Sequence, residues 1–159
     1  YKEDEKKAQQ GIISNIYHDG CSSGIRLGYY QPVSKAISQS QRAVILTEGE
    51  KKSIVAAERM GMMCIDVPGV SNWRRMFEKD PDTGKRPMDV LKEAGIRLVI
   101  VAYDADKEYN KNVLKAQDML VGALKKEGIM VAVAGWDITI GKGLDDLLVA
   151  GGQPTYDLI

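Results

Sequence analysis

The stretch from Arg97 to Asp106, RLVIVAYDAD, decides the fold of this chain. Its first half, Leu98 to Ala102, is an unbroken apolar run rich in β-branched residues, which indicates a strand buried on both faces, as in parallel sheets. The stretch ends in Asp104 and Asp106, whose carboxylates repel each other unless a cation lies between them. Ligands bind beyond the carboxyl ends of strands in open α/β sheets. The two acids are therefore a candidate divalent-metal site, and the alternative is that they only cap the next helix.

Composition restricts the classes of protein to which the chain can belong. Its 159 residues are enough for one domain with a hydrophobic core. Lys plus Arg and Asp plus Glu both number 22, which argues against binding nucleic acid by bulk electrostatic attraction and leaves a local basic patch open. Cys21 and Cys64 form no CxxC motif, which indicates a reducing compartment and no zinc ribbon. No long apolar run or signal peptide is present, so we expect a cytoplasmic protein without a membrane partner.

Strands and helices are expected to alternate from Arg42 onward, which predicts an α/β fold with about four mostly parallel strands and helices on both faces. The expected strands are 42–47, 62–67, 98–102 and 129–134, and the clearest helix carries apolar residues at helical spacing between Val113 and Leu124. Residues 1–40 are expected to form a peripheral N-terminal extension that includes short strands at 12–13 and 25–30. Residues 41–159 are expected to form the domain itself, and the start at Tyr1 suggests a piece of a longer protein.

Acidic residues follow two of these expected strands. Glu48 and Gly49 come directly after the first strand, and Asp104 and Asp106 follow the third. Parallel strands end at the same edge of a sheet, so the three carboxylates converge if the first and third strands are neighbours. Hard oxygen ligands at one point suit Mg²⁺ or Mn²⁺ rather than zinc, and such a site serves phosphoryl chemistry.

This arrangement resembles the Toprim domain, in which a strand followed by Glu-Gly precedes a strand followed by Asp-x-Asp. Toprim domains occur in bacterial primases, type IA and type II topoisomerases and some nucleases. The resemblance covers roughly residues 42–150. Within the superfamily, the segments TEGEKKS, DVPGVSNW, VAYDAD and GKGLDDLL are most similar to the primase-related domain known as DUF3854, which is found in proteins of plasmids, phages and integrative elements.

The resemblance implies roles for particular residues. Glu48 matches the Toprim glutamate, a general acid/base or metal ligand, and Asp104 and Asp106 match the metal ligands of the Asp-x-Asp motif. The segment GKGLDDLL is similar to the GKDPDE-type segment of primases. Asp145 falls on the second Asp of that segment, as a further expected metal ligand, whereas Gly143 replaces the first. Glycines flank Lys142, which makes it the better candidate for a phosphate contact.

Lys51 and Lys52 follow the Glu-Gly turn at the start of the expected helix. Either side chain is expected to lie on the solvated face of that helix, or else to contact phosphates at the metal site. Lys51 is therefore a second candidate for phosphate binding.

The resemblance leaves three functions open. The first is the Mg²⁺-dependent Toprim domain of a DNA primase or primase-helicase, a nucleotidyltransferase acting on a DNA template. The second is a nuclease that uses the same acids to cut phosphodiesters. The third is a non-catalytic module that binds nucleic acid or a partner. The expected partners are DNA and nucleotides in the full-length context, together with other domains of the same polypeptide. We expect the isolated chain to be inactive as a primase.

Overall fold

One six-stranded sheet forms the centre of the molecule, with the strand order β1-β3-β2-β4-β5-β6. This computed structural model describes residues 27–30 and 42–159. The strands are β1 (Gly28–Tyr30), β2 (Ala43–Glu48), β3 (Cys64–Val67), β4 (Leu98–Val101), β5 (Met130–Gly135) and β6 (Thr155–Leu158). The α-helices are α2 (Glu50–Met60), α3 (Pro87–Glu93), α4 (Lys111–Lys126) and α5 (Leu144–Val149), and two 3-10 helices are η2 (Val70–Phe77) and η3 (Ala105–Glu108).

The α/β class is confirmed, and the sheet is larger than the four-stranded one expected. The pairs β2–β3, β2–β4 and β4–β5 are parallel, whereas β1 pairs with β3 and β6 pairs with β5 in the antiparallel sense. Strand β6 was not expected from the sequence, because it is only four residues long and all four are exposed. Strand β1 belongs to the range 1–40, but Tyr29 and Tyr30 are buried within the sheet region. The expected strand at 12–13 lies outside the described residues.

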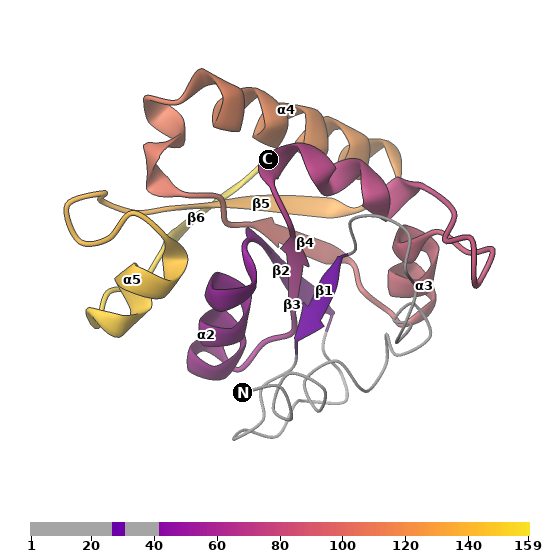
Figure 1. Ribbon diagram of the computed structural model, residues 1–159, viewed down its shortest axis with the longest axis horizontal. Coiled ribbons are helices and arrows are strands. Elements are labelled where there is room, and N and C mark those ends of the chain that lie inside the picture. Colours follow the sequence, from indigo (N-terminus) through magenta and orange to yellow (C-terminus); the bar gives the residue numbers. More distant parts are fainter. Residues whose placement is uncertain (1–26, 31–41) are drawn as a thin grey trace.

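Helices cover both faces of the sheet, as expected for alternating strands and helices. Figure 1 shows α4 on one side of the sheet and α2 and α5 on the other. Along β4, Val99 and Val101 pack into the core beneath α4, whereas Ile100 faces the opposite core beneath α2 and α5. The Arg97–Asp106 stretch therefore contains a strand buried on both faces, as its apolar run predicts.

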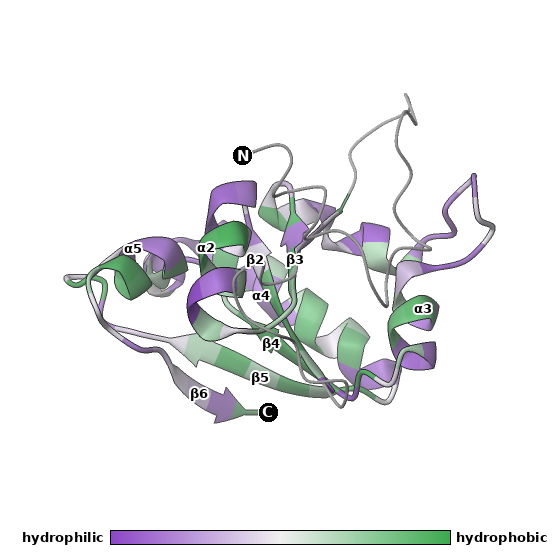
Figure 2. Ribbon diagram, turned by 90° about the horizontal axis from the view of Figure 1, so that it is seen from below, coloured by the Kyte–Doolittle hydropathy of each residue, from purple (hydrophilic) through white to green (hydrophobic). Residues whose placement is uncertain are grey.

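Hydrophobic residues are concentrated in the interior strands. Figure 2 shows β4 and β5 mostly in the hydrophobic colour, while the edge strand β6 carries hydrophilic residues. In the described part of the chain, no helix combines the length and the apolar character needed to cross a bilayer.

The connections place a switch in direction between β2 and β4. The chain leaves β2 through α2 to reach β3 on one side, and later returns to β4 on the other side of β2. Val44 lies opposite Val99 and Leu46 opposite Val101, and the amide of Ala102 donates a hydrogen bond of 2.9 Å to the carbonyl of Leu46. The carboxyl ends of two adjacent parallel strands therefore meet at the kind of switch point beside which α/β sheets bind ligands.

Candidate functional site

The Glu48–Gly49 turn brings the first acidic residue to this edge of the sheet. Glu48 is the last residue of β2, and Gly49 has a φ of 105°, a backbone conformation that side-chain-bearing residues rarely adopt. The Gly49 amide donates a hydrogen bond of 2.8 Å to Oδ1 of Asp66, on the neighbouring strand β3. Burial raises the pKa of Asp66 to about 6. The turn is thus held to the adjacent strand by a mostly buried carboxyl group.

A second contact fixes the first turn of α2 against β2. The hydroxyl groups of Thr47 and Ser53 lie 2.5 Å apart, and both residues are fully buried. Ser53, Ala56 and Ala57 form the buried face of α2. The preceding residue, Lys52, therefore lies at the border of that buried face and is directed toward the ends of β2 and β4.

Lys52 joins the acids of the two strands. Its Nζ lies 2.8 Å from Oδ1 of Asp104 and 3.4 Å from Oε2 of Glu48. Burial by itself would lower the pKa of Lys52, but these two carboxylates outweigh it and raise that pKa. Burial also raises the pKa of Asp104, and Lys52 offsets part of that shift. The cation that relieves the repulsion between Glu48 and Asp104 in this structure is thus a lysine side chain.

Asp106 and Lys142 lie beside this group. Oδ2 of Asp106 is 3.4 Å from Nζ of Lys142, and the amide of Ala105 donates a hydrogen bond of 2.8 Å to the carbonyl of Lys142. The short helix η3 is also tied to β5, because the buried Nζ of Lys107 donates a hydrogen bond of 2.6 Å to the carbonyl of Ala134. The loop after β4 and the loop before α5 are therefore held together by backbone as well as by charge.

Asp145 approaches the same place from the start of α5. Its side chain is only 8% exposed, and its Oδ2 lies 3.5 Å from Nζ of Lys51, whose side chain is 82% exposed. Gly143 lies between these side chains and leaves room for them, because it has no Cβ. A Cβ at this position would lie 2.6 Å from Oδ1 of Asp145, 2.9 Å from Cε of Lys52 and 3.5 Å from Oδ1 of Asp104. A glycine is favoured here because two charged side chains pass close to where a Cβ would lie.

The carboxylate oxygens at this edge of the sheet suit a hydrated magnesium ion only in part. In the described residues, Oδ1 of Asp106 and Oδ1 of Asp145 are buried and accept no hydrogen bond, so each has a lone pair available for a cation. The same residues contain no group of three acidic, histidine or cysteine side chains placed to hold a metal together. Mg²⁺ commonly uses one or two carboxylates and keeps several waters. Asp104 and Asp106 suit such a site, whereas the full set with Glu48 is not brought together.

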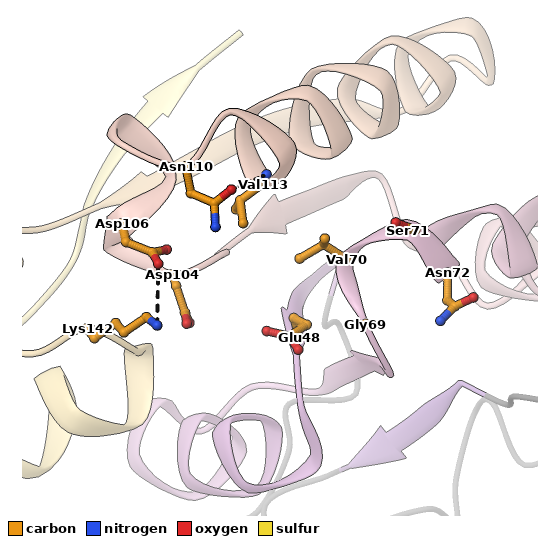
Figure 3. A pocket seen from close by; sticks show the side chains of 10 residues that line it. All are labelled: Glu48, Gly69, Val70, Ser71, Asn72, Asp104, Asp106, Asn110, Val113 and Lys142. Atoms are coloured by element: carbon orange, nitrogen blue, oxygen red, sulfur yellow. Dashed lines mark hydrogen bonds and ion pairs between the residues drawn. The ribbon is translucent and has the colours of Figure 1, made fainter.

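A pocket of about 470 Å³ opens beside these residues. Figure 3 shows Asp104 and Asp106 close to Lys142, which is joined to Asp106, and Glu48 at the end of β2 between this pair of acids and Val70. The rest of the lining is neutral and comes from the start of η2 and the start of α4: Gly69, Val70, Ser71, Asn72, Asn110 and Val113. The volume lies in the range of small-molecule sites. The pocket thus combines three carboxylates, one exposed lysine and a set of amide, hydroxyl and aliphatic groups.

Comparison with known families gives one match. The family described as "Domain of unknown function (DUF3854)" matches residues 33–155, which is most of the chain. The chain belongs to this family. The match includes Glu48, Asp104, Asp106, Lys142 and Asp145, so the whole acidic edge of the DUF3854 domain falls within it. No curated protein matches the chain.

The site residues expected in this DUF3854 domain are brought to one edge, but with a different pairing. Glu48, Asp104, Asp106 and Lys142 line one pocket. Lys51 pairs with Asp145 at the start of α5. Lys52 is the residue that the sequence analysis did not distinguish. Its spacing of four residues from Glu48 was the available signal, because side chains at i and i+4 of a helical turn are neighbours.

Proposed function

We propose that this DUF3854 domain has the Toprim (Rossmann-like) fold and is the Mg²⁺-dependent catalytic domain of a DNA primase or primase-helicase from a mobile genetic element. The observation that carries the proposal is the placement of Glu48 and Asp104 at the ends of adjacent parallel strands, beside a pocket that also contains Asp106. This is the arrangement that the Glu-Gly and Asp-x-Asp motifs imply. The reaction would be nucleotidyl transfer on a DNA template, with nucleotides and DNA as partners.

Each residue would have a distinct task. Asp104 and Asp106 would hold Mg²⁺ (or Mn²⁺), supported by the buried Oδ1 of Asp106 that lacks a hydrogen bond in the described structure. When bound, such an ion neutralises charge on phosphate oxygens. Glu48 would take a proton from the attacking hydroxyl group. Lys142, whose side chain is 62% exposed in the pocket wall, would contact a phosphate group.

Two of the expected roles receive less support from the contacts. Asp145 contributes a buried oxygen near Gly143 but already pairs with Lys51, so we propose it as a support for the site rather than as a direct metal ligand. Lys51 is turned toward Asp145 and is absent from the pocket lining. It is therefore a weaker candidate for phosphate binding than Lys142.

One observation favours a second candidate, a non-catalytic module that binds nucleic acid or a partner. Lys52 already balances the charge of Glu48 and Asp104, so the fold does not need a metal to relieve their repulsion. In that case the pocket would bind its ligand without catalysing a reaction.

The test uses the full-length gene product with a single-stranded DNA template, ribonucleotides and Mg²⁺. A primase makes short RNA products, and Asp104→Asn and Asp106→Asn each abolish them. Nicking of plasmid DNA without RNA synthesis would instead identify a nuclease. DNA binding that persists without either reaction, in wild type and variants alike, would favour the non-catalytic module.

A further inference from the structure

Lys52 lies between two acids from different segments of the chain. Its Nζ contacts Asp104 at 2.8 Å and Glu48 at 3.4 Å. Glu48 ends β2, whereas Asp104 lies beyond the end of β4. In two-metal sites the ions lie about 3.5–4 Å apart. A second divalent ion held by Glu48 and Asp104 would therefore compete directly with this ammonium group.

The position of Lys52 is built into the fold and is not a chance contact of a surface side chain. Its side chain is 21% exposed, compared with 82% for the adjacent Lys51. The Thr47–Ser53 contact fixes the start of α2, and the missing side chain at Gly143 leaves room for the lysine stem, since a Cβ there would lie 2.9 Å from Cε. The Thr47–Ser53 contact and the space beside Gly143 together place the ammonium group of Lys52 at the end of β2.

The other side of Asp104 has a different character. Lys142 pairs with Asp106 at 3.4 Å through a side chain that is 62% exposed, so water and salt compete with this contact. Oδ1 of Asp106 is buried without a hydrogen bond among the described residues. Unpaired buried carboxylate oxygens are costly unless a cation or water satisfies them. The place with unmet demand for a cation is thus the Asp104–Asp106 side.

We propose that Lys52 substitutes for one metal ion of this site, so that the domain binds a single divalent ion at Asp104 and Asp106 and uses the lysine as its second positive charge. This inference rests on the proposed function, because it assumes that the acidic edge binds a divalent metal. It adds that the number of ions is one and that a residue of the chain sets this number.

The test is titration of the 159-residue chain with Mn²⁺, followed by electron paramagnetic resonance of the free ion. We expect wild type to bind one Mn²⁺ per chain and Lys52→Met to bind two. Lys52→Arg keeps the charge and should bind one. The matched control Lys51→Met removes the same charge from the neighbouring residue and should also bind one. Circular dichroism checks folding, and Lys52→Gln replaces the methionine variant if that variant does not fold.

The possible outcomes separate the inference from the proposed function. Two ions in wild type, or one ion in wild type and in both uncharged variants of Lys52, would overturn the role of Lys52 and leave a metal-dependent function standing. Equal gains in Lys52→Met and Lys51→Met would also overturn it, because they would reflect net charge alone. If neither wild type nor any variant binds Mn²⁺, the acidic edge is not a metal site, and both the inference and the proposed catalytic function are wrong.

Discussion

Replacing Gly143 by alanine tests the geometry of the acidic edge directly. The added Cβ would lie 2.6 Å from Oδ1 of Asp145 and 2.9 Å from Cε of Lys52, both closer than carbon tolerates, whereas the φ of −97° suits any residue. The cost is therefore one of packing alone. Overpacking of this kind costs about 1–3 kcal/mol, and the contacts are side-chain ends that can shift, which favours the lower half of that range. The smaller entropy of the unfolded alanine chain offsets about 0.4–1 kcal/mol, leaving a net loss of about 1 kcal/mol.

Gly122→Ala provides the matched control. Gly122 lies inside α4, and no atom comes within 4 Å of the Cβ position. Alanine should therefore stabilise the protein by about 0.5–1 kcal/mol, through helix propensity. Urea denaturation monitored by circular dichroism measures both changes in the free energy of unfolding. If Gly143→Ala is as stable as wild type or gains stability as Gly122→Ala does, then Lys52 and Asp145 do not occupy the space that the structure assigns to them.

Three further predictions concern pH, a charge network and activity. Burial raises the pKa of Asp66 from 3.8 to about 6. Its contribution to the free energy of unfolding is therefore full below pH 3.8 and decreases by about 3 kcal/mol in all as the pH rises through 6. Asp66→Asn should remove this decrease in urea titrations between pH 4 and 7, and the same pH dependence in wild type and variant would refute the prediction. Arg86 precedes α3 and donates hydrogen bonds of 2.7 Å to Glu127 and to Asp89 in the first turn of α3. Arg86→Ala should therefore cost about 1–2 kcal/mol, and less at high salt; a salt-independent loss in thermal melts would argue for lost packing instead. Asp104→Asn should abolish template-dependent synthesis by the full-length protein while the variant still folds, and retained synthesis in a primer assay would exclude Asp104 from the reaction.

The presence of the main strands could be predicted because it depends on local patterns, whereas the adjacency of β2 and β4 entered the prediction only as a condition. The run from Leu98 to Val101 is apolar at every position, and such a strand needs cover on both faces, which is what α4 and α2 provide. The meeting of Glu48 with Asp104 follows from two parallel neighbours that end at one edge. Strand β6 could not be predicted, because its residues are exposed and it joins the sheet through backbone hydrogen bonds with β5.

The pairing of charges within the site could not be predicted from the sequence. Lys51 and Lys52 are chemically identical neighbours, and only the rotation of α2 about its buried face decides which one reaches the acids. Gly143 stands where an aspartate was expected because the aliphatic stem of Lys52 passes within 2.9 Å of the Cβ position. The main acids of the site can be recognised in the sequence as motifs. Their charge pairing depends on contacts between segments that are distant in the sequence.

Anomalous diffraction from crystals grown or soaked with Mn²⁺, at a concentration that saturates binding in solution, would locate a divalent ion at this edge of the sheet directly. We expect a peak within ligand distance of Asp104 and Asp106, accompanied by loss of the contact between Lys142 and Asp106. A peak elsewhere on the protein, with none beside these two acids, would contradict the assignment of this edge as a metal-dependent site.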